Sequence, residues 1–341
     1  MLGKMENARA AKWDNLKAIL IFLVVFGHFL YSVPGDSPTA QKLILLIYTF
    51  HMPLFLFVGG LFSKSAVSGG KKGQGRVLVY VLLFLLLSGI TYGIKIAAGQ
   101  KADIELLGTY HVPWYMAVMA LFLWLMRAAC HLKAGLVLSA SVLCACLAGY
   151  DPDVGNFLFL SKTVSFFPFF AAGYYLDAAK LEKALAPRWV KAAAVVVLGG
   201  FFALVWLGEG WYRAQFSPLL MLSAPAPYTK LPAPAFGFFV RLIWYALVTV
   251  VSLALIALTP KKPCFLSSLG RRTLPVYFWH VPLQQLYGIS GLAVWLPAQL
   301  PLPKTVIIAL ITVLLLFLLS RPVMARPFTF LMRPWRREER V

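Results

Sequence analysis

The amino-acid sequence predicts an all-α integral membrane protein, a bundle of about ten transmembrane helices with N- and C-termini cytoplasmic. Three observations lead to this prediction: the apolar composition, the length of the apolar blocks and the placement of the basic residues. Of the 341 residues, 60% are hydrophobic and 13% are charged, and the mean hydropathy is +0.78. Soluble globular domains contain roughly 45–50% apolar and about 25% charged residues. The composition therefore excludes an ordinary soluble domain.

The apolar residues are grouped in blocks of the length that crosses a hydrocarbon core about 30 Å thick. Such blocks must be helices, because the bilayer leaves no water to satisfy backbone N–H and C=O groups. We expect a single transmembrane domain over residues 1–341, with no soluble second domain and no internal repeat. The predicted spans are 16–33, 43–62, 77–94, 112–127, 133–149, 163–178, 190–207, 238–258, 274–296 and 304–320.

The basic residues alternate between rich and poor segments along the chain. Of the 32 Lys and Arg residues, 24 lie at the two ends and in every second loop. The positive-inside rule then predicts an even number of spans with both ends inside. The same pattern explains the net charge of +20 as a topology signal and argues against a nucleic-acid partner.

Cysteine spacing predicts neither a disulfide framework nor a metal site, and we expect every cysteine to be unpaired. The cysteines are Cys130, Cys144, Cys146 and Cys264. The first apolar block is long and no small-residue cleavage site follows it, so no cleavable signal peptide is expected. The longest predicted loop, 208–237, faces outside in this topology and is either a cap over a cavity or a surface linker with interfacial aromatics.

Polar residues inside apolar spans are costly and are therefore functional candidates. In the first span, Asp14 is expected to cap the helix start. Lys17 lies at the inner boundary, where it either serves a site or extends its ammonium group to the lipid head groups. His28 follows eleven residues later, about 16 Å along a helix and almost three full turns on. Lys17 and His28 therefore project from nearly the same helix face.

Three further histidines lie in or beside predicted spans. His51, eight residues from the nearest end of the predicted second span, is at a depth similar to that of His28. In the same span, Gly59-Gly60 favours close helix packing. His280 in the ninth span is expected nearer the inner side, where it either joins the site or bonds a carbonyl freed by Pro282. His111 marks the outer mouth of the fourth span, beside aromatic residues typical of a membrane interface.

The ordered set of these motifs resembles the acyltransferase-3 family of bacterial membrane proteins, in particular its fucose 4-O-acetylase-like branch. The first-span pattern of Asp, Lys and His over Asp14–His28 carries the resemblance. It continues along nearly the whole chain, through Phe50-His-Met-Pro-Leu-Phe55 with Gly59, Pro113-Trp-Tyr115, Phe167–Tyr174 and Tyr277-x-x-His-x-Pro282. One departure is the basic loop Lys71-Lys72-Gly-Gln-Gly-Arg76, which keeps the charge but not the spacing of the family's Arg-x-x-Arg element.

The resemblance implies a multi-pass protein of the bacterial cytoplasmic (inner) membrane. It also implies transfer of an acetyl or succinyl group from an acyl-CoA-type donor to a hydroxyl of a cell-surface carbohydrate. It implies His28 as the general base, His51 as an assisting group, and Lys17 in the site or on the donor. Lys71, Lys72 and Arg76 would bind the donor. Acetyl-CoA (or another acyl-CoA) enters as a co-substrate, with no tightly bound cofactor. The acceptor is a surface glycan or a lipid-linked sugar, reached either directly or through an acyl-enzyme relay.

Two other classes of function also fit a chain of this kind. A transporter or exporter of a polysaccharide or lipid-linked sugar also has proline-broken helices and membrane histidines. Against it, no internal repeat is visible and no Asp or Glu lies in the core of a predicted span. The other class is a structural membrane component of a biosynthetic complex, which predicts that substitutions of Lys17 and His28 are tolerated.

Overall fold

The structure is a computed structural model that describes residues 2–32, 37–101, 108, 113–155, 157–221, 226–300 and 302–336. These residues form helices and connecting turns, and the described part of the chain contains no strand. The contacts divide the chain into two compact units. The first unit comprises Met1–Ile47, Leu85–Ile104 and Thr259–Val341, and the second comprises Tyr48–Phe84 and Glu105–Leu258.

The α-helices in chain order are α1 (Leu2–Tyr31), α2 (Pro38–Leu61), α3 (Lys64–Ser68), α4 (Gly70–Ala97), α5 (Trp114–Ala129), α6 (Ala134–Leu147), α7 (Leu160–Tyr175), α8 (Ala178–Ala184), α9 (Arg188–Leu207), α10 (Glu209–Met221), α11 (Gly237–Leu258), α12 (Phe265–Gly270), α13 (Thr273–Ile289), α14 (Leu292–Gln299), α15 (Lys304–Leu319) and α16 (Pro322–Arg336). Short 3₁₀ turns η1 (Ala148–Tyr150), η2 (Phe157–Phe159), η3 (Pro227–Lys230) and η4 (Pro234–Phe236) connect some of them.

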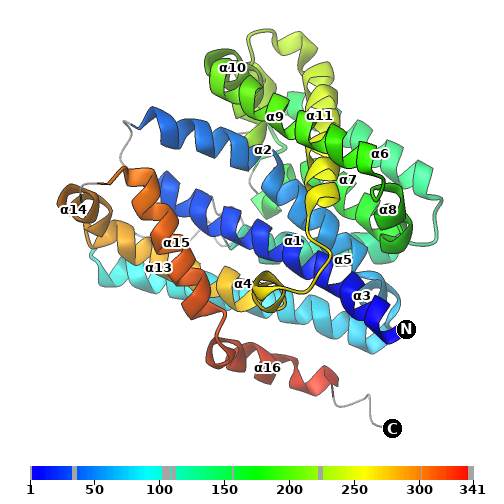
Figure 1. The fold of residues 1–341 in the computed structure, drawn as a ribbon, viewed down its shortest axis with the longest axis horizontal. Helices are drawn as coiled ribbons and strands as arrows, with labels where there is room; N and C mark the ends of the chain where they lie inside the picture. The colour runs from blue at the N-terminus through cyan, green and yellow to red at the C-terminus, as the bar shows by residue number, and fades with distance from the viewer. Residues whose placement is uncertain are drawn as a thin grey trace. The chain divides into compact units, whose positions relative to one another are not determined.

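Helix α1 is the central element of the first unit. It packs along α12, α13 and α15, and Figure 1 shows it in dark blue beside the orange α13 and α15. Several of its apolar side chains, among them Leu16, Leu20 and Val25, are fully buried. At the end of the chain, α15 is followed by α16 at a bend of 57°. Helix α1 is therefore packed against α12, α13 and α15 within this unit.

In the second unit, α9 packs on α11 and α6 packs on α7. Two glycines bring α2 and α7 into backbone contact: a Cβ at Gly60 would clash with the Phe170 carbonyl, and one at Gly173 with the Phe57 carbonyl. This confirms the predicted close helix packing for Gly60, whereas a Cβ at Gly59 would meet only side-chain atoms of Met119 and Phe170.

Each predicted span coincides with helical structure. By length and composition, six described helices are able to cross a membrane, or seven if α15 and α16 form one bent span. Two more predicted spans correspond to shorter apolar helices, Trp114–Ala129 and Ala134–Tyr150. The ninth, 274–296, differs: it is broken between α13 and α14, where Gly291 has a φ of +76°. The chain is therefore helical and rich in membrane-length helices, while ten crossings and cytoplasmic termini stay predictions.

The predicted outer loop 208–237 is more structured than expected, because it contains α10 and the turns η3 and η4. Tyr228 anchors it. This side chain is 1% exposed, its hydroxyl donates to the Cys146 carbonyl at 2.9 Å, and it accepts from Arg241 Nε at 3.3 Å. Burial raises the pKa of Tyr228, against the lowering effect of Arg241, so the hydroxyl stays protonated and donates. The segment is thus folded onto its own unit; a role as a cap over a cavity stays a prediction.

Replacing Tyr228 by phenylalanine should destabilise the protein by about 1–3 kcal/mol, because it leaves the buried Cys146 carbonyl and Arg241 guanidinium without one partner each. Thermal unfolding of the detergent-solubilised protein measures the effect. The matched control is Tyr31→Phe, since Tyr31 is 65% exposed. Equal midpoints for the two variants would show that Tyr228 does not anchor the segment.

Candidate active site

The candidate site lies in the first unit, where α12 and α13 run alongside α1 in one register. Three side-chain hydrogen bonds join residues that are each 252 positions apart. Ser267 Oγ donates to Asn15 Oδ1 at 2.7 Å, His28 and His280 share a bond of 2.9 Å, and Gln284 Nε2 donates to Ser32 Oγ at 2.7 Å. A constant offset means that the two segments rise together, so polar groups on α1 meet polar groups at the same level.

The histidine pair, His28 and His280, is the middle one of these three contacts between α1 and the α12–α13 segment. Nδ1 of His28 lies 2.9 Å from Nε2 of His280, and the two rings are stacked with centroids 5.1 Å apart. Nδ1 of His280 lies 3.1 Å from the Val276 carbonyl. A carbonyl only accepts, so this nitrogen of His280 carries the proton.

This bond determines the tautomers of both rings. His280 is 0% exposed, and a buried imidazole is expected to be uncharged and to carry a single ring proton. Its Nε2 therefore accepts, and Nδ1 of His28 donates to it. The remaining lone pair of His28 is then on Nε2. That is the arrangement of a general base oriented by a second group, as in catalytic dyads and triads.

The position of His280 corrects a prediction, because it was expected nearer the inner side than His28. Residues of the two segments that lie at the same level differ by 252 in number. Residue 274, where the predicted ninth span starts, is therefore level with residue 22 of α1. It is not level with residue 16, where the predicted first span starts. That difference is about 9 Å at 1.5 Å per residue. His280 does bond a carbonyl, but it is that of Val276 and not the Phe278 carbonyl that Pro282 leaves without its helical donor.

Nearer the N-terminal end of α1 than the histidine pair, Asp14, Lys17 and Arg271 form a charged cluster. Lys17 Nζ lies 2.8 Å from one carboxylate oxygen of Asp14, and Arg271 Nη1 lies 3.8 Å from the other. Two cations and one anion leave the cluster with one net positive charge. The prediction that Asp14 caps the helix start is wrong, since α1 begins at Leu2 and Asp14 is inside the helix. Lys17 is ion-paired with Asp14, and extension of its ammonium group toward the lipid head groups stays a prediction.

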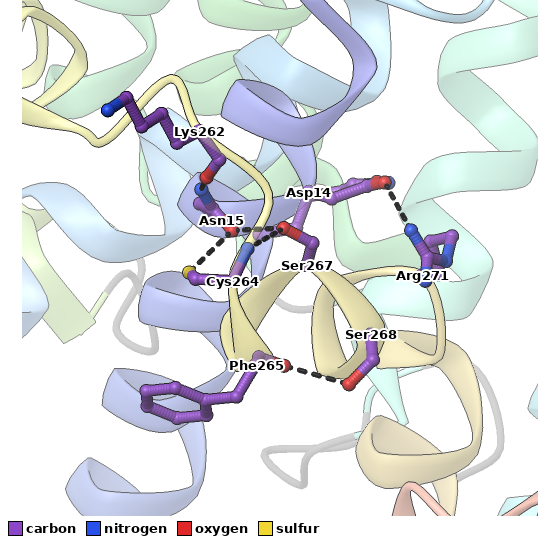
Figure 2. A network of polar contacts seen from close by, with 9 residues as sticks. Asp14, Asn15, Lys262, Cys264, Phe265, Ser267, Ser268 and Arg271 are labelled. Atoms are coloured by element: carbon purple, nitrogen blue, oxygen red, sulfur yellow. Dashed lines mark hydrogen bonds and ion pairs between the residues drawn. The ribbon is translucent and has the colours of Figure 1, made fainter. Parts of the chain in front are cut away.

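Beside this cluster, Asn15 fastens the chain before α12 to α1, as Figure 2 shows. Its amide donates to the carbonyls of Pro260 at 2.9 Å and Lys262 at 3.1 Å, and its oxygen accepts from Ser267. Gly270 permits this approach, because a Cβ there would clash with the backbone of Asp14. Asn15 and Gly270 together set the register that aligns His28 with His280.

Other predicted site residues belong to the second unit. His51 is 2% exposed, and its ring contacts that of Tyr48 at 4.9 Å between centroids. Arg76 is exposed, and its Nη1 donates to Ser65 Oγ at 3.0 Å. Lys71 and Lys72 lie in α4, outside the described side chains, and His111 lies outside the described residues. Roles for these residues stay predictions.

The four cysteines are free, as predicted. Among the residues that the structure describes, no group of three or more His, Cys, Asp and Glu side chains is arranged to hold a metal ion.

Sequence reasoning missed three residues of this site: Asn15, Arg271 and the role of His280 as partner of His28. Asn15 adjoins Asp14 at the inner end of an apolar block, and a polar residue there was a usable signal. Arg271 was grouped with the other loop cations as topology signals. For His280 the motif was recognised, but its partner depends on the register between two helices far apart in the sequence.

Comparison with known proteins finds a matching family model and related curated proteins. A family model described as an acyltransferase domain matches residues 11–321. Nodulation protein NolL of Sinorhizobium fredii (strain NBRC 101917 / NGR234) is 30% identical over 185 residues, 49% of this chain and 49% of that protein. Nodulation protein NolL of Mesorhizobium japonicum (strain LMG 29417 / CECT 9101 / MAFF 303099) is 31% identical over 124 residues, 32% of this chain and 33% of that protein.

The matched segments thus cover about half and about a third of these two relatives. No solved structure is significantly similar to the chain. The family match covers far more than half of the chain and contains Asp14, Lys17, His28 and His280. The chain belongs to the acyltransferase-3 family, a family of O-acyltransferase enzymes.

Proposed function

We propose that this protein is a membrane O-acyltransferase that moves an acetyl or succinyl group from an acyl-CoA-type donor to a hydroxyl of a carbohydrate at the cell surface. The observation that carries the proposal is the histidine pair. His280 donates from Nδ1 to the Val276 carbonyl, so its Nε2 accepts from Nδ1 of His28, and the lone pair of His28 is then on Nε2. Family membership supplies the reaction class.

In the proposed reaction, Nε2 of His28 removes the proton of the acceptor hydroxyl as the oxygen attacks the thioester carbonyl carbon. The C–O bond forms and the carbonyl oxygen becomes an oxyanion. From the family resemblance alone, His51 is proposed to stabilise that charge or to orient His28. The C–S bond then breaks, and the thiolate leaving group takes the proton from the His28 imidazolium. His280 accepts the hydrogen bond from His28 Nδ1 throughout, which holds the ring in one tautomer.

The donor is proposed to bind at the charged cluster. Its phosphates are anionic, and Lys17 and Arg271 outnumber the single carboxylate of Asp14. Asp14 keeps the Lys17 ammonium in place while Arg271, with a side chain 62% exposed, is accessible to a soluble donor. The basic segment Lys71, Lys72 and Arg76 is proposed from the family resemblance to contribute further contacts to the donor.

The experiment that tests this function uses the purified full-length protein in lipid vesicles with acetyl-CoA labelled in the acetyl group. We expect label to pass to carbohydrate extracted from the source cells, and free CoA to appear at the same rate. Mass spectrometry of surface glycans from strains with and without the protein should show a difference of one acyl group. The Lys17→Gln variant should need a higher acetyl-CoA concentration for half-maximal rate, because the cluster loses a cation.

The transporter alternative predicts a different result in the same vesicles. A transporter would move carbohydrate across the bilayer without consuming acetyl-CoA, and a structural component would do neither. Absence of acetyl-CoA consumption by a folded protein, together with unchanged glycan masses in the deletion strain, would overturn the proposed acyl transfer.

A further inference from the structure

Helix α16, drawn in red in Figure 1, packs on α13 through one of its faces. The ring of Phe328, which is 3% exposed, lies 5.2 Å from that of Phe278 and 6.4 Å from that of Trp279 between centroids. Trp279 Nε1 donates to the Met324 carbonyl at 3.3 Å. Met324 and Phe328 are four residues apart and lie on the same side of the helix. The other faces of α16 are therefore directed away from α13.

A second face of α16 is apolar and exposed. Val323 is 52% exposed and Phe330 is 71% exposed, and Pro327 between them is exposed as well. Spacings of four and then three residues set these positions on one face of a helix. Packing against α13 thus leaves on α16 an apolar surface that gains free energy when it is removed from water.

Basic residues border this exposed apolar face. Arg326 is exposed and is four residues before Phe330, so the two are neighbours on the helix surface. Residues 321–336 contain four arginines and neither Asp nor Glu. One of the four, Arg333, repeats the basic position of Arg326 seven residues later in the sequence. The segment therefore combines an apolar face with a positive charge that none of its own residues offsets.

Helix α16 directly follows the apolar helix α15, from which it is bent by 57°. Arginine in the hydrocarbon core of a bilayer is costly, whereas Val323 and Phe330 in water leave apolar surface exposed. A helix that lies in the membrane interface avoids both costs. Its apolar face enters the acyl region there, and its arginines reach the head groups.

We propose that α16 docks in the membrane interface and that its partner is an anionic phospholipid surface. Val323 and Phe330 enter the acyl region, and Arg326 binds the phosphate groups of the lipid heads, which supply the negative charge that the segment itself lacks. The continuity of α16 with α15 keeps it at the end of a helix pair that is long and apolar enough to cross a membrane. This inference is independent of the proposed function, because it requires neither an acyl donor nor an acceptor.

Photo-labelling of the full-length protein in lipid nanodiscs tests the proposal with three probes. Two are a phosphatidylglycerol and a phosphatidylcholine with a diazirine in the head group, and the third is a phosphatidylglycerol with a diazirine at the end of an acyl chain. Labelled peptides are identified by mass spectrometry. We expect the phosphatidylglycerol head-group probe to label α16 most strongly. Added salt should reduce its advantage over phosphatidylcholine, because exposed charges are screened.

Matched variants separate the basic part of the surface from the apolar part. Arg326→Gln should lower the ratio of phosphatidylglycerol to phosphatidylcholine labelling about fivefold, the effect of one basic residue at an anionic surface. Arg188→Gln should leave that ratio unchanged, since Arg188 is also exposed but begins α9 in the second unit. Phe330→Ser should lower labelling of α16 by both head-group probes. Its control is Phe236→Ser, because Phe236 is 61% exposed and lies outside α16.

Three results would overturn the proposal. Strongest labelling by the chain-end probe would place α16 in the hydrocarbon core as a continuation of α15. Equal labelling by the two head-group probes, unaffected by salt and by Arg326→Gln, would show that α16 does not recognise anionic lipid. Absence of labelling by all three probes would show that another protein or a second copy of this chain covers the apolar face.

Discussion

Replacing His28 by alanine should lower acyl transfer by about 10²–10⁴-fold, the usual contribution of a positioned general base. The variant loses the Nε2 lone pair that is proposed to accept the proton of the acceptor hydroxyl, and it leaves His280 Nε2 without its donor. Donor binding should change little, since the charged cluster is formed by Asp14, Lys17 and Arg271. We therefore expect the loss in kcat, with a nearly unchanged KM for acetyl-CoA.

The measurement is acetyl-CoA consumption by purified protein in vesicles, with glycan acylation in cells as a second readout. His131→Ala is the matched control, because His131 is exposed and lies in the second unit. Thermal unfolding of both variants verifies that they are folded. A folded His28→Ala protein with wild-type turnover would exclude His28 as the base.

Variants of His280 separate its positioning role from a purely structural one. His280→Phe keeps a ring of similar size but removes the acceptor, so turnover should fall by about 10²-fold, as expected when a reacting group is misplaced. His280→Gln offers a carbonyl oxygen to His28 Nδ1 and should recover part of that loss. If the two variants have equal activity and equal stability, the hydrogen bond has no role in orienting His28.

The sequence was sufficient to predict the helices, and the reason is physical. Blocks of apolar residues have few alternatives in a membrane, so their positions follow from composition. The alignment of Lys17 and His28 also followed, because it depends only on the geometry of a single helix. Predictions that involve one helix at a time were thus the most accurate.

The predictions were wrong where the structure depends on residues outside a single apolar block. The N-terminal residues before Asp14 were treated as a cytoplasmic tail, although Ala, Met, Glu, Lys and Arg favour helices there and α1 begins at Leu2. Within the predicted outer loop, Glu209 and Arg213 form an (i, i+4) ion pair of 2.6 Å that supports α10. Both signals are present in the sequence, but neither one lies in an apolar block.

The histidine pair was not predictable by the same means. Its formation depends on the offset of 252 residues between α1 and α13, and this offset is set by contacts that lie more than ten residues away. Hydropathy places the two spans in the membrane but leaves their axial shift undetermined. The close approach at Gly270 determines that shift, so the geometry of the site depends on a residue with no side chain.

Substituting Gly270 by alanine should consequently impair both stability and activity. The added Cβ would clash with the backbone of Asp14, and neither α1 nor α12 can move a backbone atom aside without losing other contacts. Overpacking of this kind costs about 1–3 kcal/mol, and occasionally more. Separation of α12 from α1 would weaken the bond from Ser267 to Asn15 and the ion pair of Arg271 with Asp14. We expect a lower unfolding midpoint and a higher KM for acetyl-CoA.

The matched control is Gly288→Ala on α13, because no atom lies within contact distance of a Cβ built there. In a helix this change should be neutral or stabilising by up to about 1 kcal/mol, since alanine has the higher helix propensity. Thermal unfolding and acetyl-CoA titration of both variants distinguish a local clash from a general effect of adding a methyl group. If Gly270→Ala keeps the wild-type midpoint and KM, the register of α1 and α13 must be set elsewhere, and the seam between them is stabilised mainly by its own hydrogen bonds.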